Sequence, residues 1–227
     1  MCRACLISYA KRTLTSMAGL FLFAIGIYLQ IISGVGVAPW NVLNDGLAQA
    51  AGLTFGDASI LISFLILMTD LALKEPIGLG TLLDAILIGI WVDWLTAWGP
   101  VPPPQTLLYQ VLITAVSIFI ICYGQYVYMS AGLSCGPRDA LMVAVGKRLP
   151  RIPIGTVNIL LMSLALLGGF LMGGSTGLGT VLAMVCMGFC MDLVFGWVHF
   201  EPRSVHQESL VETFRNLRAA LAAPQEK

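Results

Sequence analysis

Charged residues are scarce in this sequence: 12 Lys and Arg, together with 12 Asp and Glu, make up only 11% of 227 residues. Soluble domains carry roughly a quarter charged residues. Hydrophobic residues reach 58% of the chain, so there are too few polar side chains to cover a surface that faces water. The composition therefore excludes an ordinary soluble domain and predicts an integral membrane protein.

Signatures of catalysis are also missing. The sequence has only two His residues, and it contains no cluster with metal-ligand spacing, no phosphate-binding loop and no ATP-binding domain. The run from Gly173 to Gly177 fits Gly-x-Ser-x-Gly, but it joins two apolar segments, whereas that motif requires a strand, a turn and a helix. We expect no enzyme, no metal, no cofactor and no nucleic-acid partner.

Long apolar runs, in contrast, are plentiful. About 20 such residues cross a bilayer, and six segments qualify: 15–34, 56–74, 78–98, 106–130, 153–173 and 177–198. They divide the chain into an N-terminal segment (1–14), a first membrane repeat (15–98), a linker (99–105), a second membrane repeat (106–198) and an amphipathic tail (199–227). Ser209 and Glu212 have the spacing of a helix capping box in that tail.

Basic residues indicate the orientation of these spans, because cytoplasmic loops of membrane proteins are enriched in Lys and Arg. With the N-terminus in the cytoplasm, six spans place all 12 Lys and Arg on the cytoplasmic side. The three loops on the other side, 35–55, 99–105 and 174–176, contain none. Both ends of the chain, including the tail, are therefore expected in the cytoplasm, and the linker outside.

The two membrane repeats resemble each other in sequence. GIYLQIISGVGVAPWNVL from Gly26 aligns with GQYVYMSAGLSCGPRDAL from Gly124, and GLGTLLDAILIGIWVD from Gly78 aligns with GLGTVLAMVCMGFCMD from Gly177. Each repeat holds three spans, an odd number, so the second is expected to be inverted relative to the first. Inverted repeats are common in secondary transporters, with binding sites where the repeats meet.

A short helix is expected after the first span of each repeat. Pro39 and Pro137 suit the first position of a helix, and about 13 residues at 1.5 Å each are too few to cross the bilayer core. These helices lie at the interface or re-enter the membrane. Glycine and proline form the framework of the repeats: Gly34, Gly36, Pro39, Gly78, Gly80, Gly132, Pro137, Gly177 and Gly179. The fold class is thus an all-α membrane protein of about six transmembrane helices.

The glycine, proline and tryptophan pattern resembles that of the YczE/YitT-like bacterial membrane proteins. Matching residues within 17–197 are Gly34, Gly36, Pro39, Trp40, Asn41, Leu43, Gly78, Gly80, Thr81 and Asp84. Asn41 departs from this pattern, in which Asp is expected. The resemblance implies a multi-pass protein of the bacterial plasma (inner) membrane. It supplies no substrate, because the family has no defined biochemistry.

Polar residues within and beside the spans are the candidates for a site. Buried charges in membrane proteins are costly and mark functional positions. Asp70 precedes Lys74 by four residues, so a local ion pair explains it. The candidates for binding a solute come from both repeats and are Asn41, Asp84, Asp93, Arg138, Asp139, Asn158 and Asp192. Asp93 and Asp192 align in the repeat, and each serves either as a gate or proton relay, or as a structural carboxylate.

Two functions remain open at this stage. The first is a permease that moves a small solute by alternating access between inverted halves. The second is a membrane helper that transports nothing and binds a lipid or a partner for another pathway. A cavity lined by polar residues from both repeats favours the first, and a dry interior with an external apolar groove favours the second. The lipid bilayer is the expected surrounding in both cases, and the sequence leaves homo-oligomer formation open.

Reporter fusions test the orientation. We expect a fusion after Gln105 to report an external location and a fusion after Lys147 to report a cytoplasmic one, because every Lys and Arg is then cytoplasmic. Alkaline phosphatase and green fluorescent protein fusions measure the two sides. An external signal after Lys147 would contradict the arrangement of six spans.

Overall fold

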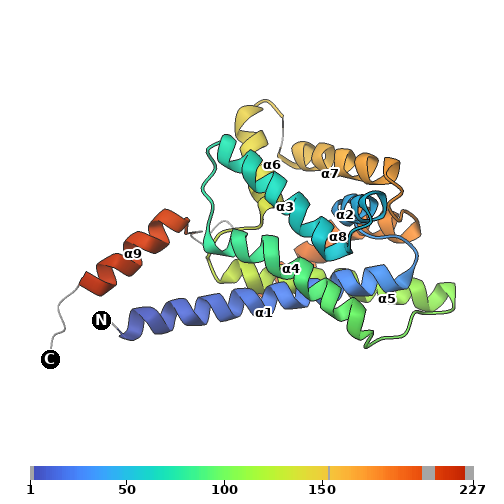
Figure 1. Cartoon of the computed structure of the whole chain (residues 1–227), viewed down its shortest axis with the longest axis horizontal. Helices are drawn as coiled ribbons and strands as arrows, with labels where there is room; N and C mark the ends of the chain where they lie inside the picture. The colour runs from blue at the N-terminus through green and yellow to red at the C-terminus, as the bar shows by residue number, and fades with distance from the viewer. Residues whose placement is uncertain (1–2, 153, 201–207, 223–227) are drawn as a thin grey trace.

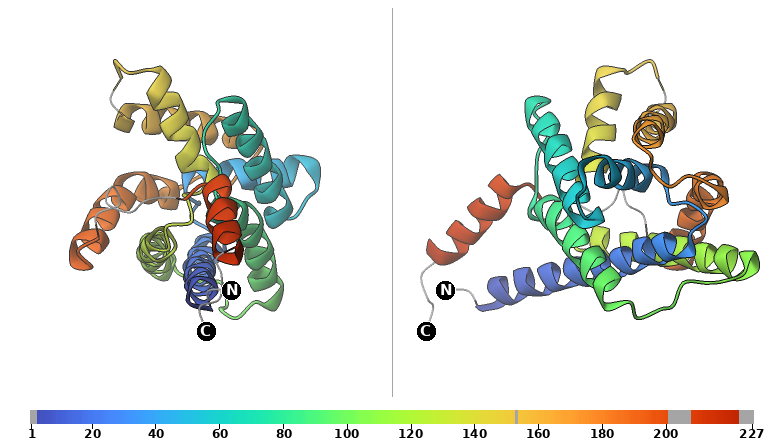
Figure 2. Two further views of the ribbon diagram at one scale, coloured as in Figure 1. Left: turned by 90° about the vertical axis from the view of Figure 1, so that its left-hand side faces the viewer. Right: turned by 45° about the vertical axis from the view of Figure 1, so that its right-hand side comes forward.

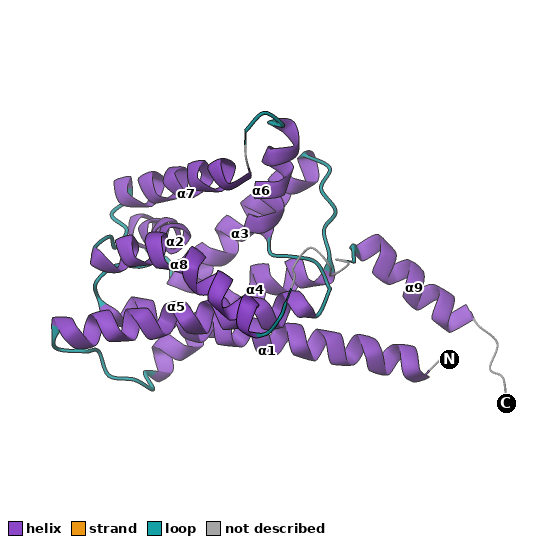
Figure 3. Ribbon diagram, turned by 180° about the vertical axis from the view of Figure 1, so that it is seen from behind, coloured by secondary structure: helices purple, strands orange, loops and turns teal. Residues whose placement is uncertain are grey.

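Helices make up the structure, which is a computed structural model that describes residues 3–152, 154–200 and 208–222. Within these ranges every regular element is helical (Figure 3). The helices are α1 (Arg3–Ser33), α2 (Pro39–Ala51), α3 (Phe55–Ala72), α4 (Leu79–Trp98), α5 (Leu107–Ser130), α6 (Pro137–Arg148), α7 (Ile154–Leu171), α8 (Leu178–Trp197) and α9 (Leu210–Ala222).

Five of these helices are long and apolar enough to cross a membrane: α3, α4, α5, α8 and the part of α1 from Ile7 to Ser33. The sixth expected span corresponds to α7, whose apolar part, Thr156–Leu171, is shorter. Large apolar side chains, such as Phe189 and Leu193 on α8, are exposed along these helices. An apolar exterior of this kind suits contact with lipid rather than water.

Proline and glycine set the boundaries of the short helices, as the sequence predicts. α2 begins at Pro39 and ends before Gly52, whose φ of 67° is left-handed and favours glycine. α6 begins at Pro137. These helices are 13 and 12 residues long, too short to span a bilayer core. α1 begins at Arg3, so this helix extends into the segment assigned to residues 1–14.

The order of elements is the same in both halves: a long helix, a short helix that begins with proline, and two more helices. α1 packs along α5, and α6 and α7 lie on the opposite side of the bundle (Figure 1). α4 packs on α1, and α8 packs on α5. The short helix of each half contacts the other half, since α2 packs on α7 and α6 packs on α3.

Two equivalent backbone hydrogen bonds join the halves. The amide of Gly80, in the first turn of α4, donates to the carbonyl oxygen of Leu133 at 2.7 Å. The amide of Gly179, in the first turn of α8, donates to the carbonyl oxygen of Val35, also at 2.7 Å. A Cβ atom on Gly80 would lie 2.8 Å from that Leu133 oxygen, so only glycine permits the approach. Each half thus holds the start of a helix that belongs to the other.

The tail begins against the body of the protein. Arg12 of α1 forms an ion pair with Glu208 at 2.8 Å and donates to the carbonyl oxygens of Ala131 and Gly132 at the end of α5. The expected capping box forms, because the Ser209 amide donates to the Glu212 carboxylate and the Glu212 amide donates to the Ser209 hydroxyl. α9 then extends beside the first turns of α1, away from the other helices (Figure 2).

Glycine also allows α1 and α5 to approach closely. A Cβ atom on Gly124 of α5 would lie 2.8 Å from the carbonyl oxygen of Gly19 on α1. Contacts between small residues are a common basis of helix packing in membranes. The main apolar core lies beside this contact and includes Leu20, Ile27, Val92, Ile121 and Tyr128.

The substitution Gly124→Ala tests this packing. We expect it to destabilise the protein by about 1–3 kcal/mol, because the added methyl group overpacks the interface between α1 and α5. Thermal unfolding in detergent measures the effect. The matched control is Gly196→Ala in α8, where a Cβ atom meets nothing within 4 Å. The control should be neutral or slightly stabilising, since alanine favours helix over glycine. Equal melting temperatures for the two variants would contradict this packing.

Candidate functional site

A cavity of about 330 Å³ lies between the two halves. It is at the lower end of the range of about 300–1,000 Å³ that is typical of small-molecule sites. Residues from all eight helices of the two repeats line it, from Phe23 of α1 to Met191 of α8. Such a position, where two related halves meet, is where transporters with internal repeats bind their solutes.

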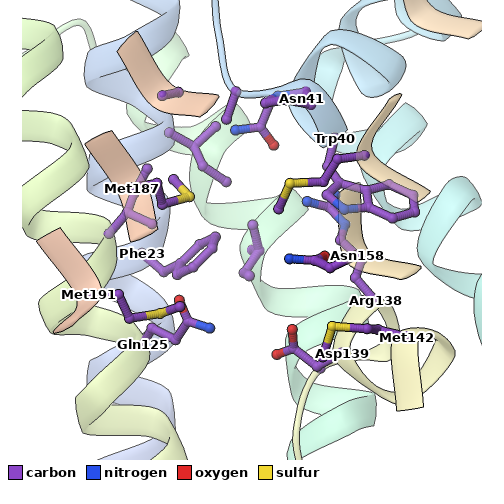
Figure 4. Close-up of a pocket in the computed structure, with 18 of the residues that line it drawn as sticks. Phe23, Trp40, Asn41, Gln125, Arg138, Asp139, Met142, Asn158, Met187 and Met191 are labelled. Carbon is purple, nitrogen blue, oxygen red and sulfur yellow. The ribbon is translucent and has the colours of Figure 1, made fainter. Parts of the chain in front are cut away.

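Five of the seven predicted site residues line this cavity. They are Asn41 of α2, Asp84 of α4, Arg138 and Asp139 of α6, and Asn158 of α7. In Figure 4, Arg138, Asp139 and Asn158 lie on the same side of the cavity as Trp40 and Met142. Phe23, Gln125, Met187 and Met191 face them from the other side. The two short helices therefore bring their first turns, one from each half, to one space.

Arg138 is the cation of the cavity. Its guanidinium lies over the ring of Trp40, 5.4 Å from the ring centroid, in a cation–π arrangement. Among the described residues no carboxylate lies within ion-pair distance of it, although Asp84 and Asp139 line the same cavity. Burial lowers the pKa of Arg138, and the two nearby carboxylates oppose that effect. The guanidinium donors are therefore available to a ligand.

Two carboxylates supply the negative charge of the cavity. Asp139 accepts a hydrogen bond of 3.1 Å from the hydroxyl of Tyr128. Burial raises the pKa of Asp139, while this hydrogen bond and Arg138 oppose the rise. Asp84 approaches the chain just before α6, where a Cβ atom on Gly136 would lie 2.8 Å from its Oδ2 atom. Glycine at position 136 thus makes room for the Asp84 carboxylate beside the start of α6.

The remaining two predicted residues lie elsewhere. Asp93 of α4 accepts hydrogen bonds from the Thr54 hydroxyl at 2.5 Å and from the Gly56 amide at 2.8 Å, so it holds the start of α3. This is the structural alternative that the sequence left open. Asp192, its counterpart on α8, is exposed and lies outside the cavity lining. These two candidates therefore do not line the cavity with the other five.

Asp70 is a further correction. The structure contains no ion pair between Asp70 and Lys74, because α3 ends before Lys74, which is exposed and has a φ of 60°. Asp70 is completely buried instead, and neither carboxylate oxygen has a hydrogen-bond partner among the described residues. A carboxyl group in such a place is stable only if it is neutral or holds a cation. Asp70 does not line the cavity.

Several lining residues were not predicted from the sequence. Gln125 and Tyr128 of α5 bring polar atoms to the cavity, and five methionines supply much of its apolar wall: Met142, Met162, Met184, Met187 and Met191. In the repeat, Tyr128 aligns with Gln30 and Gln125 aligns with Ile27, so neither position is preserved and the repeat gave no signal for them. Methionine in apolar spans is ordinary in composition, and only the three-dimensional arrangement brings these five together.

Apolar spans and short proline-initiated helices around an internal cavity together define a multi-pass membrane protein. Residues 10–195 match DUF6198, a family of unknown function, and the chain belongs to that family. The resemblance to YczE-like proteins is confirmed by a match to the uncharacterized membrane protein YczE of Bacillus subtilis, 32% identical over 77% of this chain and 80% of YczE.

Two further relatives are similar over most of their length. An uncharacterized protein of Haemophilus influenzae is 36% identical over 74% of this chain and 76% of its own. The uncharacterized protein YyaS of Bacillus subtilis is 31% identical over 78% of this chain and 88% of its own. No solved structure matches the chain. The relatives support a membrane location and leave the activity to be inferred from the site.

The pair Asp93 and Asp192 offers a matched test of the structural role. We expect Asp93→Ala to destabilise the protein by about 1.5–3 kcal/mol, because two hydrogen bonds to a charged group are lost. Asp192→Ala should change stability by less than about 0.5 kcal/mol, since that carboxylate is exposed. Thermal unfolding in detergent measures both variants. Equal losses would contradict the assignment of Asp93 to the start of α3.

Proposed function

We propose that this protein is a permease that moves a small solute across the bacterial plasma membrane by alternating access between two inverted repeats. The observation that carries the proposal is a cavity between the halves whose two flanking helix pairs differ. α3 and α4 are packed together beside it, whereas α7 and α8, their counterparts, are not packed together along their described length. The proposal includes no chemical change of the solute.

The pattern of contacts supports the inverted repeat. If the halves are exchanged, the packing of α1 on α4 becomes that of α5 on α8, and the packing of α2 on α7 becomes that of α6 on α3. The bonds from Gly80 to Leu133 and from Gly179 to Val35 exchange as well. With three spans in each half, such an exchange corresponds to an axis in the plane of the membrane.

The packing of α3 on α4 is a closed junction. Gly56 and Gly89 lie back to back there, since a Cβ atom on Gly89 would lie 2.6 Å from the carbonyl oxygen of Gly56. The same Cβ atom would lie 2.7 Å from a side-chain atom of Ile60. Asp93 adds its two hydrogen bonds to the start of α3. Together these contacts seal the space between the two helices.

The corresponding junction between α7 and α8 is open. Ile159, Gly188 and Asp192 are the counterparts of Ile60, Gly89 and Asp93, at a constant offset in the sequence. A Cβ atom on Gly188 would meet nothing within 4 Å, and Ile159 is 62% exposed. Residue types that close one junction are thus present at the other without making the same contacts.

The orientation of the chain in the membrane assigns the closed junction and the open junction to opposite sides. If the N-terminus is cytoplasmic, as the Lys and Arg residues predict, α3 begins on the outside and α7 begins in the cytoplasm. The closed junction is then external and the open junction is cytoplasmic. Under this proposal the structure corresponds to an inward-facing state, and closure of α7 on α8 with opening of α3 from α4 would produce the outward-facing one.

A second candidate is the membrane helper that binds lipid. The observation in its favour is an apolar groove of about 650 Å³ between α7 and α8, lined by residues that include Leu166, Phe170 and Val181. For a helper the groove would be permanent, whereas in a permease it would close. The movement of α7 against α8 therefore distinguishes the two functions.

Cysteine cross-linking tests this movement in a variant that lacks the native cysteines. Ile60→Cys with Gly89→Cys should form a disulfide in the inward-facing state, because a Cβ atom at position 89 would lie against the Ile60 side chain once the Gly56 carbonyl oxygen, 2.6 Å away, has shifted. Ile159→Cys with Gly188→Cys should form one only when α7 closes on α8. We expect both pairs to oxidise in membranes, in separate proteins, and each disulfide to abolish exchange of solute across the membrane.

The control pair lies one residue further along each helix. Ile159 and Gly188 line the cavity, whereas Leu160 and Phe189 are exposed and do not line it, so cysteines at positions 160 and 189 should stay reduced. Gel mobility after oxidation by copper phenanthroline measures all three pairs. If the pair at 159 and 188 also stays reduced while the pair at 60 and 89 oxidises fully, α7 and α8 do not close and the permease proposal fails.

A further inference from the structure

The charges in the cavity define what kind of solute fits it. Arg138 supplies one positive charge, and Asp84 and Asp139 supply two carboxylates, without an ion pair of 4 Å or less between them in the described structure. Charged groups that are removed from water require partners. A simple anion would satisfy Arg138 and leave the carboxylates, and a simple cation would leave Arg138.

We propose that the solute is a small zwitterion with an apolar group, whose anionic end is bound by Arg138 and whose cationic end is bound by Asp84 and Asp139. A guanidinium binds carboxylate or phosphate through two parallel hydrogen bonds. The two carboxylates are the groups that bind an ammonium ion. This inference rests on the proposed function, because it assigns the solute of the same cavity.

The rest of the lining fits the apolar group. Met187 and Met191 of α8, with Phe23 of α1, face the polar residues across the cavity (Figure 4). Methionine side chains are flexible and polarizable, so they adapt to apolar groups of different shape. The Arg138 guanidinium lies over the Trp40 ring, with its Cζ atom 5.4 Å from the ring centroid. A cation–π contact of this kind uses no hydrogen-bond donor of the guanidinium.

Two sources supply such a zwitterion, and the cavity has features that suit each. A free molecule, such as an amino acid with an apolar side chain, fits a volume of about 330 Å³. The head group of a zwitterionic lipid carries the same two charges, and its chains would lie in the apolar groove, which shares Met184 with the cavity. The experiment separates these sources.

The test uses three molecules that share one branched apolar group and differ in the charged groups that they carry. Leucine is the zwitterion, 4-methylpentanoate lacks its ammonium group, and 3-methylbutylamine lacks its carboxylate. Titration calorimetry with the purified full-length protein in detergent measures their binding. A second arm uses glycerophosphoethanolamine and a short-chain phosphatidylethanolamine, each of which carries one phosphodiester anion and one ammonium group. We expect the zwitterion of at least one arm to bind at least tenfold more tightly than its singly charged analogues.

Variants assign the two ends of the solute. In Arg138→Gln, removal of the carboxylate from the ligand should no longer weaken binding. This variant should therefore bind leucine and 3-methylbutylamine equally. In Asp84→Asn, the difference between leucine and 4-methylpentanoate should shrink at least tenfold. Asp57→Asn is the control, because it removes the same charge from an exposed position outside the cavity. Circular dichroism and thermal unfolding establish that each variant is folded. If phosphatidylethanolamine is the ligand, the same comparisons are made with its singly charged analogues.

The outcomes separate this inference from the proposed function. If a singly charged analogue binds as tightly as the zwitterion, or if the folded protein binds no molecule of either arm, the zwitterion assignment is wrong, even when the pair at 159 and 188 cross-links. If zwitterions bind selectively and that pair never cross-links, the assignment stands and the permease proposal fails. Binding that is equal in the wild type and in Arg138→Gln for all three molecules would also overturn the zwitterion assignment.

Discussion

The close approach of backbone to backbone at Gly80 and Gly179 is the constraint on which the architecture depends. Each glycine donates its amide to a carbonyl oxygen in the loop that follows the first helix of the other half. A side chain at Gly179 would collide with the Gly36 carbonyl, just as one at Gly80 would crowd Leu133. Inside a membrane, where water cannot replace a missing partner, such bonds are costly to lose. The halves are thereby fastened at two equivalent points.

These two hydrogen bonds do not involve the contacts between α3 and α4 or between α7 and α8. The interface of α1 with α5 and the two glycine hydrogen bonds involve equivalent parts of both halves. They are therefore compatible with either half being open. The remaining junctions differ between the halves, because α3 packs on α4 whereas α7 does not pack on α8 in the described part of the chain. The cavity lies between these fixed and variable parts, and the first turns of α2 and α6 bring Asn41 and Asp139 to it. A rigid centre with two unequal flanks is what alternating access requires.

Sequence patterns predicted the helices well, because span length, Pro39, Pro137 and the repeated glycines act locally. They also predicted five cavity residues: Asn41, Arg138 and Asp139 lie at the starts of the short helices, and Asp84 and Asn158 are polar residues within apolar helices. The repeat could not decide between the two roles left open for Asp93 and Asp192, because a repeat preserves a structural contact such as that of Asp93 as readily as a cavity residue. Asp70 was misassigned because the end of α3 before Lys74 depends on the following chain. The methionine wall depends on packing between distant helices, for which a single sequence holds no pattern.

The exchange of contacts between halves has a consequence for how the protein is made. The amide of Gly80 finds its acceptor only at Leu133, about fifty residues later in synthesis, and at about 5–20 residues per second the delay is several seconds. The first repeat therefore enters the membrane incomplete. The Val35 carbonyl oxygen obtains its hydrogen-bond donor later still, when Gly179 has been synthesised. Native structure in the first half is completed only when the second half is in place, so a chain released midway through synthesis leaves the Gly80 amide and the Val35 carbonyl oxygen without these partners.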